Sequence, residues 1–211
     1  AGPARAVLAL EGAGRASGDV IVTAHPGGEV RGLVLPAAAP RAGCGELLER
    51  HGGPEAAPPI LAGASAAGRF ASAGDDGRVA LHDVSGASVG PECAADGARA
   101  LALGVSASGT VAAAAFSGGL IRVVVEGAEA PLEVSLEGAR AVAVDPAGEW
   151  VAAGDERGDV RVYDLADGEL RLRWTATPES AGRLPGRRSA AVTALDVTAD
   201  GARLLSSSRE R

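Results

Sequence analysis

Turn glycines followed by alternating apolar and polar residues recur along the chain. In four copies the second residue after a glycine is β-branched, and the alternation continues from there. Side chains of a strand point alternately to its two faces, so a period of two after a glycine predicts a strand leaving a hairpin. We expect turns of this repeat to be shaped by Gly28, Gly77, Gly119, Gly158, Asp76, Asp83 and Asp164.

A second set of glycines runs in phase with the first. Alternating apolar residues precede each one, as Leu103 and Val105 do in one copy, and predict a strand that enters a second turn. Short runs of small residues, such as 70–73, connect the two sets and predict a crowded middle strand. Alternating stretches at 132–135 and 170–173 predict outer strands with one solvated face. The glycines of this set are Gly68, Gly109, Gly148 and Gly201.

The spacing of the glycines indicates a repeated four-stranded unit. Successive glycines within a set lie 39 to 53 residues apart, and a propeller blade repeats at about 40–45 residues. The longer intervals contain stretches rich in Pro, Gly and charged residues, which we interpret as insertions at 36–59 and 175–189. The sequence therefore predicts an all-β propeller with about four blades of four antiparallel strands. The expected blade segments are 19–35, 60–97, 98–138, 139–175 and 190–211.

The residues around these turns resemble the WD40 family. Residues 70–77 and 81–83 resemble its LASGSDDG and LWD motifs, with His82 in the tryptophan position. Tyr163 takes that position in the segment 160–164, and 142–148 resembles the family's LxFxPDG stretch. The resemblance covers 19–35 and 60–211. It implies a ring, most often of seven blades, so we expect this chain to be part of a longer protein. A stable monomer with one cooperative melt would contradict that expectation.

The sequence also departs from the family pattern. It contains no Gly-His dipeptide, and the Trp–Asp sites of two units read Leu33–Val34 and Val124–Val125. We therefore expect the family's His–Asp–Ser–Trp hydrogen-bond tetrad to be incomplete in every blade.

Three successive units are similar to the amino-terminal propeller of the replisome adaptor with WD repeats and an HMG box. The middle unit lacks Trp–Asp and is followed by Pro131. Here a partial blade precedes these units, and the sequence contains no HMG box. The likeness implies a replisome- or chromatin-associated adaptor as an alternative function.

Composition and charge narrow the class of partner. Hydrophobic residues make up 46% of the chain but aromatic residues only 2%, so the core must consist of Ala, Val and Leu. The net charge is −7 and the acids are spread along the chain, which argues against a nucleic-acid or anionic-membrane surface. Cys44 and Cys93 form no disulfide or zinc motif, so we expect an intracellular protein, cytoplasmic or nuclear.

Motifs that could carry chemistry have simpler explanations. The glycine-rich stretch 12–18 precedes a strand-like segment instead of the helix start that a phosphate loop needs. The Arg-Gly-Asp tripeptide at 157–159 falls on a blade turn. His82 and Asp83 are adjacent in a strand and point to opposite faces, so they cannot easily form a triad with Ser72. Acidic pairs at 75–76 and 155–156 lie in equivalent turns, which indicates turn caps. We expect no catalytic residue, metal ligand or cofactor.

The favoured function is a non-enzymatic scaffold that binds other proteins. In the loop 175–189 we expect Arg183, Arg187 and Arg188 to contact an acidic or phosphorylated partner segment. A short helix is expected at 45–51. The alternatives are a small-molecule-binding or hydrolytic propeller and a structural repeat without a dedicated ligand. The inner positions that an enzyme would use are apolar: Leu103, Val105, Val142 and Val144.

Overall fold

Strands and the turns between them account for the regular structure. The chain is described by a computed structural model at residues 6–10, 20–34, 46–64, 67–83, 85–177 and 190–209. Seventeen strands in these residues form five antiparallel sheets, and each sheet is built from consecutive strands. The all-β fold class predicted from the glycine pattern is confirmed.

The first blade is a complete four-stranded sheet. Its strands are β1 (Ala6–Leu10), β2 (Val20–His25), β3 (Glu29–Val34) and β4 (Glu46–Arg50). It is larger than the segment 19–35 assigned to it, and β4 lies within the expected insertion 36–59. The short helix expected at 45–51 is wrong, because Leu47 pairs with Arg31 across the β3–β4 ladder. Pairing with a neighbouring strand here overrides the helix propensity of Glu, Leu and Arg.

The second blade has three regular strands. They are β5 (Ile60–Ala64), β6 (Arg69–Ala73) and β7 (Val79–Asp83). A short segment takes the fourth position, where Ser88 forms an isolated bridge with His82 and the Val89 amide donates to the Leu81 carbonyl at 2.9 Å. This blade therefore lacks a regular outer strand.

The third and fourth blades are complete, and a hairpin follows them. The third blade comprises β8 (Ala100–Val105), β9 (Val111–Phe116), β10 (Leu120–Val125) and β11 (Leu132–Ser135). The fourth comprises β12 (Ala139–Val144), β13 (Trp150–Asp155), β14 (Val160–Ala166) and β15 (Glu169–Ala176). The hairpin comprises β16 (Ala191–Val197) and β17 (Leu204–Arg209).

Both sets of glycines lie in turns. Every member has a positive φ, between 61° and 90°, a region in which a residue with a Cβ is strained. The first set connects second strands to third strands, and the second set connects first strands to second strands. In the second, third and fourth blades, where both sets are present, they therefore mark the first two hairpins of the blade.

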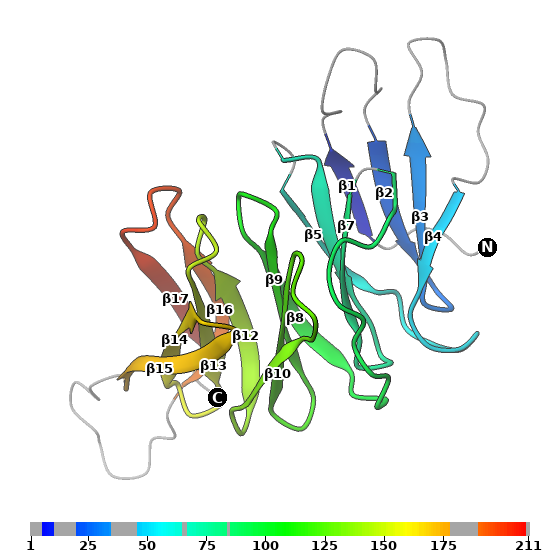
Figure 1. Cartoon of the computed structure of the whole chain (residues 1–211). Coiled ribbons are helices and arrows are strands. Elements are labelled where there is room, and N and C mark those ends of the chain that lie inside the picture. Colours follow the sequence, from blue (N-terminus) through cyan, green and yellow to red (C-terminus); the bar gives the residue numbers. More distant parts are fainter. Residues whose placement is uncertain are drawn as a thin grey trace.

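The sheets stand side by side in chain order, with β1–β4 at one end of the row and β16–β17 at the other (Figure 1). First strands of neighbouring sheets contact one another, from β1 through β5, β8 and β12 to β16. This is the arrangement of propeller blades, whose first strands surround a common axis.

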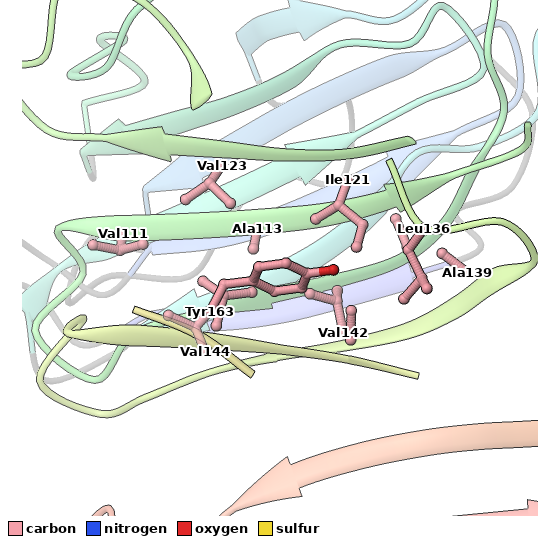
Figure 2. Close-up of a cluster of buried hydrophobic side chains, with 12 residues drawn as sticks. Val111, Ala113, Ile121, Val123, Leu136, Ala139, Val142, Val144 and Tyr163 are labelled. Carbon is pink, nitrogen blue, oxygen red and sulfur yellow. The ribbon is translucent and has the colours of Figure 1, made fainter. Parts of the chain in front are cut away.

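Buried clusters fill the seams between neighbouring sheets. Between the third and fourth blades, the Tyr163 ring lies close to Ala113, Val142 and Val144 (Figure 2). The middle strand β9 contributes four consecutive, fully buried alanines at 112–115. Small side chains let adjacent sheets approach closely, so the low aromatic content is compatible with a packed interior.

Both tryptophans belong to the fourth blade. Trp150 begins β13 and is half-buried, whereas Trp174 on β15 is 43% exposed. Leu172 on the same outer strand is 57% exposed.

Candidate functional site

Two kinds of connection meet at one end of the blades: the turns from second to third strands and the loops that enter first strands. We call this end the turn face; its described residues are 26–28, 51–59, 74–78, 94–99, 117–119, 136–138 and 156–159. The end of β15 also lies here, since Ala176 pairs with Val160, which directly follows such a turn.

A buried chain of hydrogen bonds holds the turn face of the second blade. His51, in the loop that enters β5, places Nδ1 3.1 Å from Asp76 Oδ1 and Nε2 2.9 Å from Ser72 Oγ. Ser72 Oγ lies 3.2 Å from Nε2 of His82. The three residues His51, Ser72 and His82 are fully buried, and Asp76 is nearly so. We call these four residues the tetrad.

The tetrad corrects part of the expectation that the family's hydrogen-bond set is incomplete in every blade, because the second blade assembles its His, Asp and Ser and has a histidine in place of Trp. His82 takes the tryptophan position on β7, and His51 supplies the histidine although no Gly-His dipeptide is present. The signal in the sequence is weak, because His51 follows a strand whose residues favour a helix. A histidine one residue after an outer strand, with Ser72 and Asp76 downstream, could have indicated it.

The hydrogen bonds of the tetrad run in one direction. Nδ1–H of His51 donates to Asp76, so Nε2 accepts from the Ser72 hydroxyl, and the Ser72 oxygen accepts from Nε2–H of His82. Nδ1 of His82 is buried without a partner among the described residues. Burial is the main cause that lowers the pKa of His82 to about 4, so this imidazole is neutral at physiological pH.

Asp76 is the ionised end of the tetrad. Burial alone would raise the pKa of its carboxyl, but hydrogen bonds from His51 and Arg78 outweigh that effect and hold the pKa well below its usual range. Arg78 Nε donates at 2.7 Å and the Gly52 amide at 3.0 Å. The carboxylate therefore joins the loop 51–59 to the turn 74–78.

Two glycines leave room for His51. A Cβ on Gly74 would lie 2.1 Å from the His51 Cβ, and a Cβ on Gly28 would lie 1.6 Å from the His51 carbonyl oxygen. The His51 amide donates to the Gly28 carbonyl at 2.8 Å. Because Gly28 belongs to the first blade, His51 ties the first blade to the second.

Arg122 ties the third blade to the second. This side chain on β10 is 5% exposed, and it donates to Asp96 and Glu133 at 2.7 Å each. Its Nη1 donates to the Gly77 carbonyl, and its guanidinium lies over the Phe116 ring, 5.5 Å from the centroid. A Cβ on Gly77 would come 1.9 Å from Asp96, so only glycine fits beneath this arginine.

The third and fourth blades do not repeat the tetrad of the second blade. Counting from the turn glycines, Ala114 and Ala153 take the place of Ser72, while Val124 and Tyr163 take the place of His82. Buried apolar clusters hold these blades to their neighbours instead.

A depression opens on the turn face between the second and third blades. It has a volume of about 220 Å³, and its lining includes Ile60, Gly74, Asp75, Arg99 and Leu101. Arg99 Nε lies 3.7 Å from Asp75 Oδ1, with side chains 69% and 33% exposed. The Ala57 amide donates to Asp75 at 3.3 Å. The depression thus presents one carboxylate and one exposed guanidinium beside apolar side chains.

The remaining acids singled out in the sequence lie at turns and strand ends. Asp83 accepts the Ser85 amide at 2.8 Å, and Asp155 accepts the amides of Arg157 and Asp159 at 2.8 and 3.0 Å. Asp164 lies 3.4 Å from Arg173 in an exposed pair. Asp155 caps its own turn. Counted from the turn glycine, it occupies the position of Gly74 and not that of Asp76, so it is not the equivalent of Asp76 in the fourth blade.

The three arginines expected to bind a partner, Arg183, Arg187 and Arg188, lie outside the described residues. The strands that flank this loop end at Ala176 and begin at Ala191 on the turn face.

A metal site or a nucleophilic triad requires particular side chains among the described residues. No group of three or more His, Cys, Asp or Glu side chains there could hold a metal ion. Ser72, which could form a triad with His51 and Asp76, is fully buried and hydrogen-bonded on both sides. The described part of the chain contains no helix long and apolar enough to cross a membrane.

Comparison of the sequence with protein-family models and with curated proteins finds no match. Solved structures are similar in fold. The β-propeller domain of Cps50 (Swd1) from Myceliophteria thermophila superposes with a TM-score of 0.67 at 17% identity, over 99% of this chain and 63% of that one. The fold is that of a WD40 β-propeller.

A second propeller of known structure has the same arrangement. Sqt1 of Chaetomium thermophilum, bound to the N-terminus of ribosomal protein L10, superposes with a TM-score of 0.64 at 20% identity, over 90% of this chain and 53% of that one. The chain spans less than two thirds of either propeller.

Proposed function

We propose that this propeller is a non-enzymatic, intracellular scaffold that binds protein segments on its turn face. The observation that carries the proposal is the depression between the second and third blades, which lies beside the tetrad and the Arg122 contacts. These buried contacts hold the surrounding turns in place, and a preformed surface binds with less loss of conformational entropy.

The chemistry of the depression suits a peptide. Arg99 is exposed and Asp75 is partly exposed, and such a surface pair contributes little to stability, so both side chains remain available to charged groups of a partner. Ile60 and Leu101 offer apolar contact beside them. Sqt1, which has the same fold, is bound to the N-terminus of a ribosomal protein, and this supports a peptide segment as the kind of partner.

The loop between β15 and β16, predicted from the sequence at 175–189, adds a second element to the proposal. Arg183, Arg187 and Arg188 carry three positive charges in a chain of net charge −7. We propose that they contact an acidic or phosphorylated stretch of the partner, because guanidinium groups bind carboxylates and phosphates bidentately.

Quantitative affinity capture with variants tests the function. We expect the double variant Asp75→Ala/Arg99→Ala and the triple variant Arg183→Ala/Arg187→Ala/Arg188→Ala each to lose partners that the unmodified chain retains. Arg203→Ala, an exposed change at the opposite end, is the control and should retain them. Equal recovery of every partner by all the variants would contradict the proposal.

A further inference from the structure

A second depression lies at the end opposite to the turn face, between the third and fourth blades. Its volume is about 220 Å³, and its apolar lining comes from Val111, Val125, Leu132 and Leu165. Val111 also belongs to the buried cluster of the same seam, where it lies at one edge (Figure 2). We call this depression the seam groove.

The seam groove exposes part of the interior because small residues border it. Val125, Leu132 and Leu165 are only partly buried and pack against the seam cluster from outside. Ala128, Gly148, Ala166 and Gly168 complete the border. An added Cβ would meet nothing within 4 Å at Gly168. The groove is therefore open to an apolar side chain at its Gly168 border, whereas an added Cβ on Gly148 would lie 2.8 Å from Val111.

The rim of the seam groove is acidic. Glu169 lines it, and Glu129, Glu149 and Asp167 are each adjacent in sequence to a lining residue. All four of these acids are exposed. Arg171 lies 3.2 Å from Glu169 and 3.6 Å from Asp167, whereas Glu129 and Glu149 form no ion pair with the described residues. The rim thus keeps an excess of negative charge after the pairing of Arg171, because Glu129 and Glu149 have no ion-pair partner among the described residues.

We propose that the seam groove binds a basic peptide segment that inserts one apolar side chain. The apolar side chain would cover Val125, Leu132 and Leu165, and flanking arginines or lysines would meet Glu129, Glu149 and Glu169. The inference rests on the proposed scaffold function but places a second binding surface at the other end of the blades. A phosphate-bearing ligand is disfavoured because the rim would repel it.

Short synthetic peptides test this proposal directly. The probe is a fluorescein-labelled peptide Gly-Arg-Arg-Leu-Arg-Arg-Gly, titrated with the full chain and followed by fluorescence anisotropy. We expect binding that weakens at least fivefold when serine replaces leucine and that falls as salt rises. A peptide with glutamate in place of every arginine should not bind.

Two variants separate the charge and apolar contributions. Glu129→Gln/Glu149→Gln/Glu169→Gln should weaken binding at least tenfold and flatten its salt dependence. Ala128→Leu, which fills the groove from a surface loop, should abolish the preference for leucine over serine. Far-ultraviolet circular dichroism melts would verify that both variants remain folded. Asp75→Asn, on the turn face, is the matched control and should bind the peptide like the unmodified chain.

Several outcomes would overturn the proposal. The first is that the leucine peptide does not bind at millimolar concentration. The second is that the serine or glutamate peptide binds as tightly as the leucine peptide. The third is that both groove variants bind the leucine peptide with the affinity of the unmodified chain. Sedimentation that shows self-association, lost in Ala128→Leu, would identify a second copy of the chain as the occupant instead. Failure of the turn-face variants to lose partners would count against the proposed function alone, because the peptide assay does not depend on that face.

Discussion

A buried imidazole loses its hydration, and His82 does so with one ring nitrogen unpaired. The pKa of His82 is about 4 in the folded chain, against an ordinary value of 6.5. As the pH falls, the unfolded chain therefore takes up a proton at this residue before the folded chain does. Stability is therefore unaffected by this group above pH 6.5 and falls as the pH drops toward 4. The expected loss across that window is about 3 kcal/mol, measurable by urea unfolding at pH 7.5, 5.5 and 4.5.

The variant His82→Phe isolates this effect. It keeps an aromatic ring against Phe70, whose ring is stacked on His82 with centroids 4.7 Å apart, but it cannot titrate. We expect the unmodified chain to lose about 3 kcal/mol relative to His82→Phe as the pH falls from 6.5 to 4. Asp76 acts at lower pH: because its folded pKa is depressed, its contribution is present above 3.8 and is lost as the pH falls further. A difference that stays constant from pH 7.5 to 4.5 would refute the assignment to His82.

Gly74 offers a second test at the scale of one residue. Its φ is not in the left-handed region, so the substitution Gly74→Ala is strained only by the contact with the His51 Cβ at 2.1 Å. Displacing His51 would break its buried bonds to Asp76 and Ser72, and we expect a loss of about 2–4 kcal/mol in the free energy of unfolding. Gly53→Ala is the matched control, since an added Cβ there meets nothing within 4 Å. Equal urea midpoints for the two variants would contradict the described position of His51.

At the scale of elements, Arg122 connects strand β10 to the neighbouring turn 74–78. Arg122→Met should leave the Gly77 carbonyl, Asp96 and Glu133 without their shared donor. We expect a loss of about 2 kcal/mol, below the 3–5 of a fully buried pair, because Asp96 and Glu133 are 41% and 47% exposed. Hydrogen exchange should also accelerate in the turn 74–78.

Arg161→Met is the matched control for Arg122. Arg161 occupies the same register position in the fourth blade, opposite Ala153 as Arg122 is opposite Ala114. It forms no ion pair with the described residues, so its replacement should cost less than about 1 kcal/mol. A similar loss in both variants would mean that position, and not the contacts of Arg122, decides the effect.

The strands that the sequence predicts well are those beside a turn glycine. A positive φ and an alternating strand are local properties, so β7, β10 and β14 follow directly from their own residues. β4 could not be found in this way, because Glu46–Arg50 has a helical composition and becomes a strand only by pairing with β3. Missing β4 also hid His51, whose place beside Ser72 and Asp76 depends on where that strand ends.

The candidate binding surfaces were predictable only in part. The arginines of the predicted loop 175–189 stand out in the sequence by their charge. The depression at Asp75 and Arg99 joins residues from two blades, and the seam groove joins the third blade to the fourth. Such sites require the packing of neighbouring sheets, which no single segment encodes.

At the scale of the whole molecule, the protection of backbone amides from hydrogen exchange should decline toward the last hairpin. β9 is fully buried and pairs with strands on both sides, whereas β17 pairs only with β16 among the described residues, and most of its side chains are exposed. We expect amides of β17 to exchange at least about 100-fold faster than those of β9. Mass spectrometry of peptides after deuterium labelling would measure this. Uniform protection across the two strands would show that another contact covers β17.

The position of the tryptophans decides what an optical experiment can report. Trp150 and Trp174 both belong to the fourth blade, so intrinsic fluorescence follows the surroundings of that blade and is silent about the tetrad. A denaturation curve recorded by tryptophan emission reports the unfolding of the fourth blade, whereas one recorded by circular dichroism reports all the strands. The two curves can therefore differ when the fourth blade unfolds separately. The substitution His82→Trp would place a third fluorophore in the second blade, beside Phe70, and give that blade an optical signal in addition to that of the fourth blade.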